Sequence, residues 1–219
     1  MTLKACIGNR ALGWDLLPPG SESWDYTDPK NSSLIWTYAG YHQSPNRWEK
    51  GTTPVPVNWE AGEQYDGDTE RTSVILGNLS TYYPNATNYE VAGFFWWQGD
   101  RDSYDMALSG RYEQNLVKLI KTLRSQFNAP NAKFVTASLG QTVKGDTNGG
   151  GLILDAMLAV DGTSGKYPEF KGNVAAVYTH PLSMGGSSSS HYGGNAETYM
   201  NVGQAMGAAM VNLLKGDGH

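Results

Sequence analysis

The chain of 219 residues has a single cysteine, Cys6, and only 16 basic residues, which are scattered rather than clustered. One cysteine excludes an intrachain disulfide and a cysteine-rich zinc site, so cysteine usage does not identify a redox compartment. The formal net charge of -5 comes without a basic patch, which argues against a nucleic-acid partner.

Long hydrophobic runs are also absent. No apolar run approaches the roughly 20 residues that a membrane span requires, so we expect no membrane partner. Residues 1–7 lack the length and the cleavage site of a signal peptide. The sequence therefore leaves the compartment of the protein unknown.

Aromatic residues and glycine are abundant, with 13 tyrosines, 7 tryptophans and 27 glycines. This composition suggests aromatic loops of the kind that line carbohydrate-binding clefts. Five tryptophans fall within residues 14–66, a region rich in turn-forming residues and too long for an ordinary connection. We expect a functional loop or lid there, with little regular structure except a short helix over residues 33–43.

Strand and helix patterns alternate along the chain. Buried strands are expected at residues 3–7, 90–97, 133–139 and 173–179, and helices at residues 69–83, 112–127, 152–160 and 195–214. Two of these helices carry apolar stripes at helical spacing, namely Val74, Ile75, Leu79 and Tyr82 in the first, and Tyr112, Leu116, Leu119, Ile120, Leu123 and Phe127 in the second. This alternation predicts a three-layer α/β fold with a mostly parallel sheet. The length suits one well-buried domain, so we expect residues 1–219 to form a single domain.

The most informative stretch is Phe94-Phe95-Trp96-Trp97-Gln98-Gly99-Asp100-Arg101-Asp102. An apolar run that ends abruptly in an amide and two carboxylates is typical of a buried strand that delivers polar groups to its tip. Its first half does not alternate polar with apolar residues, so we expect both faces of this strand to be covered.

Polar residues follow the expected strands at three places where an open parallel sheet binds its ligand. These are Gly8-Asn9-Arg10, the stretch from Gln98 to Asp102, and His180-Pro181 with the serine-rich segment before His191. A glycine amide and a carboxamide would supply donors to an oxyanion, and a histidine would serve as general base. Acyl transfer needs these groups and also a nucleophile, for which no clear candidate stands out.

Three blocks in this order resemble the carbohydrate-esterase branch of the SGNH hydrolases, which includes sialate O-acetylesterase-like and acetylxylan esterase-like proteins. Trp97-Gln98-Gly99-Asp100-Arg101-Asp102 resembles the branch's Trp-x-Gln-Gly-Glu-x-Asp block. Residues 4–12 resemble the block around the oxyanion glycine, and residues 191–199 resemble the block with the catalytic histidine. The resemblance implies a flavodoxin-like domain and a serine-type esterase. The substrate of such an esterase would be an acylated carbohydrate or another small ester. The enzyme would need no cofactor.

Carried over residue by residue, the resemblance makes Gly8 a backbone oxyanion donor, Gln98 a side-chain oxyanion donor and His191 the general base. The accompanying site loops would contain Asn9, Arg10, Trp97, Asp100, Arg101 and Asp102. Purely structural readings compete: a tight turn for Gly8, a buried amide for Gln98 and a helix cap for His191.

The chain has three other histidines, which suit the base role less well. His180 ends an expected strand, but beside Pro181 it fits a turn better. His42 lies in the irregular region and His219 is the last residue. His191 therefore remains the preferred base.

The chain departs from the family pattern in two ways. The family's first strand, which leads to the nucleophile turn, has no counterpart, so the expected sheet lacks a strand. A second copy of the chain, a rearranged amino terminus or an upstream segment of a longer protein would fill that gap. The family's aspartate three residues before the histidine is replaced by Ser188, so a dyad or a displaced carboxylate, Asp100 or Asp102, would hold the imidazolium.

The nucleophile is unknown from the sequence. Weak candidates within the chain are Ser187, Ser188, Ser189, Ser190 and Cys6. We expect Cys6 to be a buried structural thiol, because it lies inside the expected strand at residues 3–7.

Two other function classes stay open. One is a catalytically impaired relative that binds carbohydrate, with the tryptophans of residues 14–66 stacking against sugars. The other is a metal-dependent hydrolase, which is weak because no pair of histidines has ligand spacing. In addition, Arg101 places a cation between Asp100 and Asp102. We therefore expect no metal site.

Overall fold

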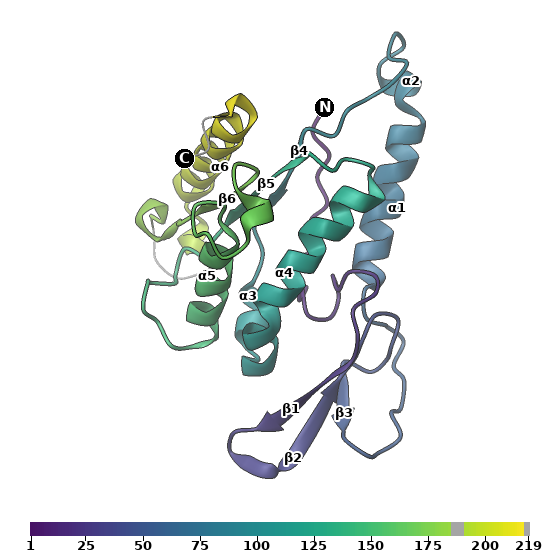
Figure 1. Cartoon of the computed structure of the whole chain (residues 1–219), viewed down its shortest axis with the longest axis vertical. Coiled ribbons are helices and arrows are strands. Elements are labelled where there is room, and N and C mark those ends of the chain that lie inside the picture. Colours follow the sequence, from purple (N-terminus) through teal and green to yellow (C-terminus); the bar gives the residue numbers. More distant parts are fainter. Residues whose placement is uncertain (185–190, 217–219) are drawn as a thin grey trace. The chain divides into compact units, whose positions relative to one another are not determined.

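The computed structural model describes residues 1–184 and 191–216. The chain divides into two compact units, Met1–Glu90 and Val91–His219, whose elements are labelled in Figure 1. The expectation of one domain over residues 1–219 stays a prediction.

The amino-terminal unit contains a small antiparallel sheet of β1 (Trp24–Asp28), β2 (Asn31–Tyr38) and β3 (Arg47–Glu49) in that order. Trp24 lies opposite Tyr38 and Tyr26 opposite Trp36, so four aromatic side chains share one face. Trp24 stacks on Tyr38 with 4.8 Å between the ring centroids. The predicted helix at residues 33–43 is therefore wrong, because alternate aromatic residues of β2 pair across to β1.

Two helices follow in this unit, α1 (Glu63–Gly77) and α2 (Leu79–Tyr82). The start of α1 precedes the predicted start at residue 69, since Gly62 takes a left-handed conformation with φ of 91° at the helix boundary. Glu63 and Asp66 add negative charge to the first turn, which favours a helix start there. Two residues of the expected apolar stripe, Val74 and Tyr82, are exposed.

The expected strand at residues 3–7 does not form. These residues are irregular and mostly exposed, and Cys6 is exposed rather than buried. Within the described residues no strand pairs with this segment, so its apolar residues have no ladder to join.

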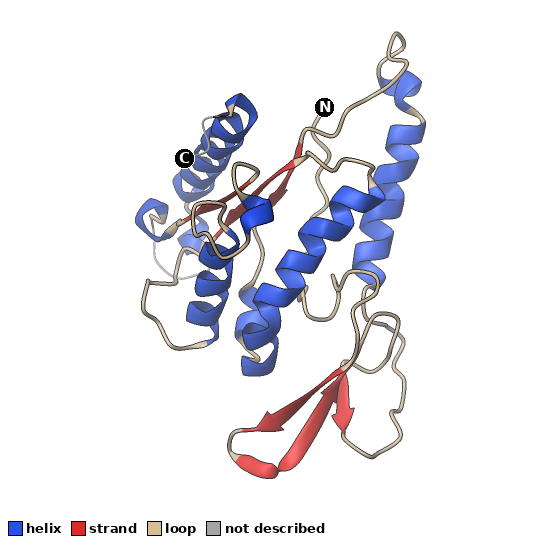
Figure 2. Ribbon diagram, viewed as in Figure 1, coloured by secondary structure: helices blue, strands red, loops and turns tan. Residues whose placement is uncertain are grey.

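The carboxy-terminal unit is built on a parallel sheet of β4 (Gly93–Trp96), β5 (Lys133–Ala137) and β6 (Val174–Val177), in the order β4-β5-β6 (Figure 2). Its three strands lie within the segments predicted at residues 90–97, 133–139 and 173–179. The mixed α/β character and the parallel sheet predicted from the sequence are thus confirmed.

Burial differs between the strands of this sheet. Phe134 and Val135 of the central strand are fully buried, whereas Phe95 of β4 is 52% exposed. The expectation that both faces of the Phe94 strand are covered is wrong at Phe95. The reason is that α6 packs on β5 and β6 and α5 packs on β6, whereas Phe95 lies on β4.

The main helices of this unit are α4 (Met106–Gln126), α5 (Gly149–Val160) and α6 (Ala196–Lys215). The apolar stripe predicted for α4 is buried at Tyr112, Leu116, Leu119 and Ile120. The Met-rich face of α6 packs on β5, where Val202, Met206 and Met210 cluster with Val135 and Ala137. Shorter elements are α3 (Asp100–Ser103), η1 (Pro168–Phe170), η2 (His180–Leu182) and η4 (Tyr192–Gly194).

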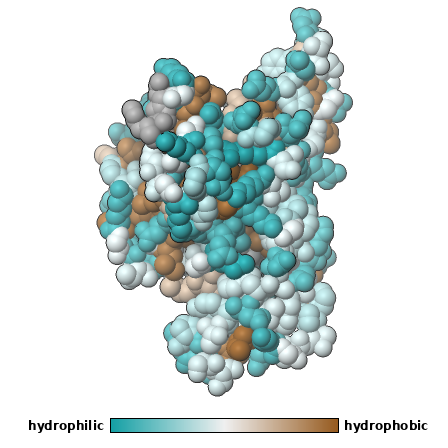
Figure 3. All heavy atoms as spheres, in the orientation of Figure 1, coloured by the Kyte–Doolittle hydropathy of each residue, from teal (hydrophilic) through white to brown (hydrophobic). Residues whose placement is uncertain are grey.

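On the face drawn in Figure 3, hydrophobic residues form small separate patches among hydrophilic ones. Pale spheres predominate around β1–β3, because tryptophan and tyrosine have intermediate hydropathy. None of the helices in the described part of the chain combines the length and the apolar character that crossing a membrane requires.

Candidate functional site

The end of β4 carries Gln98 in a chain of hydrogen bonds. Trp96 Nε1 donates to Tyr112 Oη at 3.0 Å, and Tyr112 Oη donates to Gln98 Oε1 at 2.9 Å. Gln98 Nε2 in turn donates to Asp102 Oδ2 at 2.7 Å. Asp102 and Tyr112 are both 0% exposed, so the carboxamide is held at both ends by buried groups.

Gly99 makes this arrangement possible. It has φ of 140°, which side-chain-bearing residues rarely adopt, and it precedes α3. A Cβ at this position would lie 3.0 Å from Ile153 Cγ2. Because of the turn at Gly99, α3 begins at the next residue, and its Asp102 side chain lies within hydrogen-bond distance of Gln98.

Replacing Gly99 by alanine is expected to destabilise the protein by more than about 1 kcal/mol, because the positive φ becomes strained. Gly110 provides a matched control, since it lies within α4 and a Cβ there would meet nothing within 4 Å. Gly110→Ala should stabilise by about 0.5–1 kcal/mol through helix propensity. Urea denaturation followed by circular dichroism measures both, and equal midpoints for the two variants would contradict this role of Gly99.

The ends of β5 and β6 are tied to each other and to the end of β4. Thr179 N donates to Ser138 Oγ at 3.0 Å, and His180 Nδ1 lies 2.8 Å from the Gly140 carbonyl oxygen. Gln141 Nε2 donates to Asp100 Oδ1 at 3.2 Å. The structure therefore brings two of the predicted polar segments, Gln98 to Asp102 and His180, together at the carboxyl ends of the parallel strands.

His191 is connected to the carboxyl end of the sheet through its neighbour Tyr192. The Tyr192 ring stacks on Trp97 with 6.1 Å between centroids, and Tyr192 Oη accepts a hydrogen bond from Gly140 N at 3.2 Å. Trp97, which precedes Gln98, donates from Nε1 to the Ser138 carbonyl at 3.1 Å. The backbone that carries His191 is thus fixed beside the end of β4.

The backbone of this turn is unusual. His191 and Tyr192 both have left-handed conformations, with φ of 47° and 57°. Two consecutive side-chain-bearing residues in this region are strained, and such strain concentrates at functional sites. The His191 side chain is exposed, and among the described residues nothing forms a hydrogen bond with its imidazole.

The two candidate bases differ in their surroundings. The His180 imidazole contacts the Gly140 carbonyl and stacks on Tyr178 with 6.1 Å between ring centroids. It also opens the short helix η2, where Pro181 follows it. These contacts fit the turn-shaping reading of His180.

The segment Gly8-Asn9-Arg10 belongs to the amino-terminal unit. Gly8 is exposed, and Asn9 is left-handed with φ of 60°. Arg10 Nη1 pairs with Asp15 Oδ1 at 3.0 Å, and its guanidinium lies 4.4 Å from the centre of the Trp59 ring. The oxyanion role of the Gly8 amide stays a prediction.

Other predicted site residues have the following places. Arg101 is exposed on α3. Four of the nucleophile candidates lie outside the described residues, namely Ser187, Ser188, Ser189 and Ser190, and so does His219. Among the residues that the structure does describe, no three His, Cys, Asp or Glu side chains gather where they could hold a metal ion.

Sequence reasoning missed Tyr112 as a part of this site and counted it only in the apolar stripe of α4. A signal was present, because a tyrosine amid buried leucines needs a partner for its hydroxyl. Burial raises the pKa of Tyr112 well above its ordinary value, so the phenol remains a hydrogen-bond donor.

The tryptophans expected to stack against sugars are half-buried and have protein partners. Trp24 stacks on Tyr38, Trp36 lies under the Arg47 guanidinium at 4.9 Å, and Trp59 lies under Arg10. The remaining two pack on a small core, in which Trp14 and Trp48 contact Leu17, Ala39 and Ala61.

The amino-terminal unit also contains a histidine–carboxylate cluster. Asp66 accepts a hydrogen bond from Tyr41 Oη at 2.6 Å, and its other oxygen lies 2.9 Å from His42 Nε2. Tyr41 and His42 stack with 3.9 Å between ring centroids. Burial and the Asp66 hydrogen bond raise the pKa of Tyr41. These contacts join the loop after β2, which contains Tyr41 and His42, to Asp66 in the first turn of α1.

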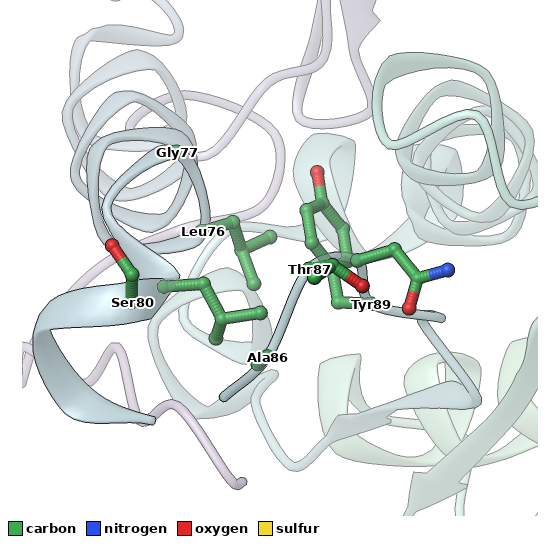
Figure 4. Close-up of a pocket in the computed structure, with 8 residues that line it drawn as sticks. Leu76, Gly77, Ser80, Ala86, Thr87 and Tyr89 are labelled. Atoms are coloured by element: carbon green, nitrogen blue, oxygen red, sulfur yellow. The ribbon is translucent and has the colours of Figure 1, made fainter. Parts of the chain in front are cut away.

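A cavity of about 440 Å³ lies between the end of α1, α2 and residues 86–89. Figure 4 shows Leu76, Ser80 and Tyr89 around it. None of its eight described lining residues is a His, Cys, Asp or Glu, so the lining offers no carboxylate or imidazole for catalysis.

Comparison with solved structures finds a protein from Arabidopsis thaliana with 18% sequence identity and a TM-score of 0.45. The match covers 68% of this chain and 52% of that protein, so the chain spans about half of the length of that protein. No curated protein matches the chain.

A family model described as carbohydrate esterase, sialic acid-specific acetylesterase, matches residues 38–212. Gln98 and His191 lie inside this range, and Gly8 lies outside it. The matched range covers most of the chain, and it agrees with the SGNH resemblance of the Gln98 and His191 blocks. The chain belongs to the carbohydrate esterase family of sialic acid-specific acetylesterases.

Proposed function

We propose that the protein is a serine-type carboxylic ester hydrolase that removes acetyl or other short acyl groups from carbohydrates or similar small esters. The observation that carries this proposal is the anchored carboxamide of Gln98 at the carboxyl end of β4. Donors held in place before the reaction stabilise the oxyanion of acyl transfer, because they need no reorganisation as the charge develops. The family membership supports the same chemistry.

In the proposed reaction, a serine hydroxyl attacks the ester carbonyl while His191 takes its proton. The carbonyl oxygen becomes an oxyanion, which accepts hydrogen bonds from Gln98 Nε2 and from the Gly8 amide. His191 then protonates the departing sugar oxygen and an acyl-serine remains. Water, deprotonated by His191, attacks this intermediate, and His191 returns the proton to the serine oxygen as the carboxylic acid is released.

Of the two carboxylates considered for support of the imidazolium, Asp100 is the better proposal. Asp102 is fully buried and accepts the Gln98 hydrogen bond. Asp100 Oδ1 accepts a hydrogen bond from Gln141 Nε2, and the Tyr192 hydroxyl accepts one from Gly140 N, so Asp100 and the turn that carries His191 are both tied to the segment after β5. A carboxylate at this end of the sheet would stabilise a protonated His191.

We further propose that the sheet belongs to a larger three-layer, flavodoxin-like arrangement in which another strand pairs with β4 and carries the nucleophile. Within the described residues, β4 has β5 as its only strand neighbour, and Phe95 is exposed. The strand would come from a second copy of the chain, from a rearranged amino terminus or from an upstream segment. The serines at residues 187–190 are the alternative nucleophiles within the chain.

A serine-directed fluorophosphonate distinguishes these sources of the nucleophile. We expect covalent labelling of one serine, detected as a mass shift and assigned by peptide sequencing. A label within residues 187–190 would identify the nucleophile as one of those serines and contradict the added-strand proposal. A purified chain that binds no label and hydrolyses no ester would contradict the proposed activity of this chain.

A further inference from the structure

We propose that Asp102 and Tyr112 are positioning residues that fix the direction in which the Gln98 carboxamide points. This inference rests on the proposed function, because it assigns both residues to the oxyanion donor of that reaction. Neither residue touches the substrate in this account. They act through Gln98, one at each end of its amide.

Asp102 determines where the amide nitrogen lies. A carboxylate only accepts hydrogen bonds, so the group 2.7 Å from Asp102 Oδ2 must be the Gln98 Nε2 donor. Turning the carboxamide over would place Gln98 Oε1 against the carboxylate, with two acceptors in contact inside a buried site. Asp102 thereby excludes the flipped amide.

Tyr112 determines where the amide oxygen lies, because it supplies a hydrogen-bond donor where Asp102 supplies an acceptor. Trp96 Nε1 is a donor only, so at 3.0 Å the Tyr112 oxygen must accept from it. The single phenol proton therefore points the other way, to Gln98 Oε1 at 2.9 Å and to the Gln98 carbonyl oxygen at 3.1 Å. In a flipped amide the phenol proton would face an NH₂ group, which cannot accept a hydrogen bond.

Both positioning residues lie on rigid elements. Asp102 belongs to α3, and Ser109 Oγ of α4 donates to its backbone carbonyl at 2.9 Å. Tyr112 lies within α4, whose buried stripe packs inside the carboxy-terminal unit. Three consecutive elements, β4, α3 and α4, thus contribute to one fixed amide.

The Asp102 charge itself opposes a developing oxyanion, because like charges repel at short range in a buried site. Its contribution to catalysis is therefore the orientation of Gln98. An uncharged acceptor at the same place keeps part of that contribution. Asp102→Asn should accordingly recover part of the rate that Asp102→Ala loses.

A double-mutant cycle between Tyr112 and Gln98 tests the inference with p-nitrophenyl acetate. We expect Tyr112→Phe to lower kcat about 10-fold with little change in KM, which is the effect of one buried hydrogen bond. In a Gln98→Ala background the same change should alter kcat less than about twofold. Tyr167→Phe is the control, since that phenol donates to the Glu113 carboxylate of α4 and not to Gln98. It should leave kcat unchanged.

A structural role would make the effect of Tyr112→Phe equal in both backgrounds, and that result would overturn the inference. A Gln98→Ala variant with the wild-type rate would instead contradict the oxyanion role in the proposed function. The two failures are therefore distinguishable by the same four proteins.

A second readout does not depend on turnover. The side-chain NH₂ group of Gln98 can be observed by ¹H–¹⁵N NMR, assigned by its loss in Gln98→Ala. We expect two well-separated proton shifts in the wild type, with the separation reduced in Tyr112→Phe and retained in Tyr167→Phe. Unchanged Gln98 shifts in Tyr112→Phe would overturn the positioning role whether or not the chain hydrolyses esters.

Discussion

Gln98→Ala is expected to lower kcat for p-nitrophenyl acetate about 100-fold or more, with a smaller change in KM. The reason is that the Gln98 donor acts mainly on charge that develops in the transition state. Its carboxamide is already aligned by Asp102 and Tyr112 before the substrate binds. Initial rates of nitrophenolate release over a range of substrate concentrations separate kcat from KM.

The matched control for this prediction is Gln64→Ala. Gln64 is also buried and donates from Nε2 to a carboxylate, Asp68 Oδ1, at 2.8 Å, but it lies in α1 of the amino-terminal unit. Its replacement should leave kcat within about twofold of the wild type. Equal losses in the Gln64 and Gln98 variants would show that a general loss of stability explains both.

His191→Ala is expected to lower kcat/KM for the same ester by about 100-fold to 10,000-fold, the usual effect of removing a general base. The strained turn at His191 and Tyr192 is held by ring stacking against Trp97, the residue that precedes Gln98. His180→Ala is the internal comparison, because the His180 imidazole contacts a backbone carbonyl and an aromatic ring.

We expect His180→Ala to retain the rate within about 10-fold after correction for any loss of folded protein. Circular dichroism at the assay temperature supplies that correction. The reverse pattern, with catalysis lost in His180→Ala and kept in His191→Ala, would transfer the base role to His180.

Helices and strands whose pattern arises from local burial could be predicted from the sequence. The stripe of α4 recurs at helical spacing, and Leu116, Leu119 and Ile120 are buried where that spacing places them. Phe134 and Val135 of β5 and the apolar run of β6 likewise indicated strands of a parallel sheet.

Elements that depend on distant partners could not be predicted in this way. Residues 3–7 are apolar enough for a strand, but a strand forms only where a neighbour accepts its backbone hydrogen bonds. Residues 33–43 are a second case: the sequence favours a short helix there, because the pairing of Trp36 and Tyr38 with β1 becomes visible only in three dimensions.

In the candidate site, too, some features follow from the local sequence and others depend on distant partners. Gln98 stands at the abrupt end of an apolar run, so it could be identified from the sequence as a polar group at a strand tip. The hydrogen bond from Tyr112 joins α4 to Gln98, which follows β4, and no spacing rule predicts it. The tie between Gln141 and Asp100 also depends on the neighbouring positions of β4 and β5 in the sheet.

An esterase site formed by Gln98 and His191 should release acetate from an O-acetylated sugar. The measurement follows the acetate methyl signal by ¹H NMR after addition of the purified protein, with a Gln98→Ala, His191→Ala double variant alongside. We predict that acetate accumulates with the wild type and stays at the uncatalysed rate with the double variant. Acetate release at equal rates by both proteins, or at the uncatalysed rate by both, would contradict the claim that Gln98 and His191 form an esterase site.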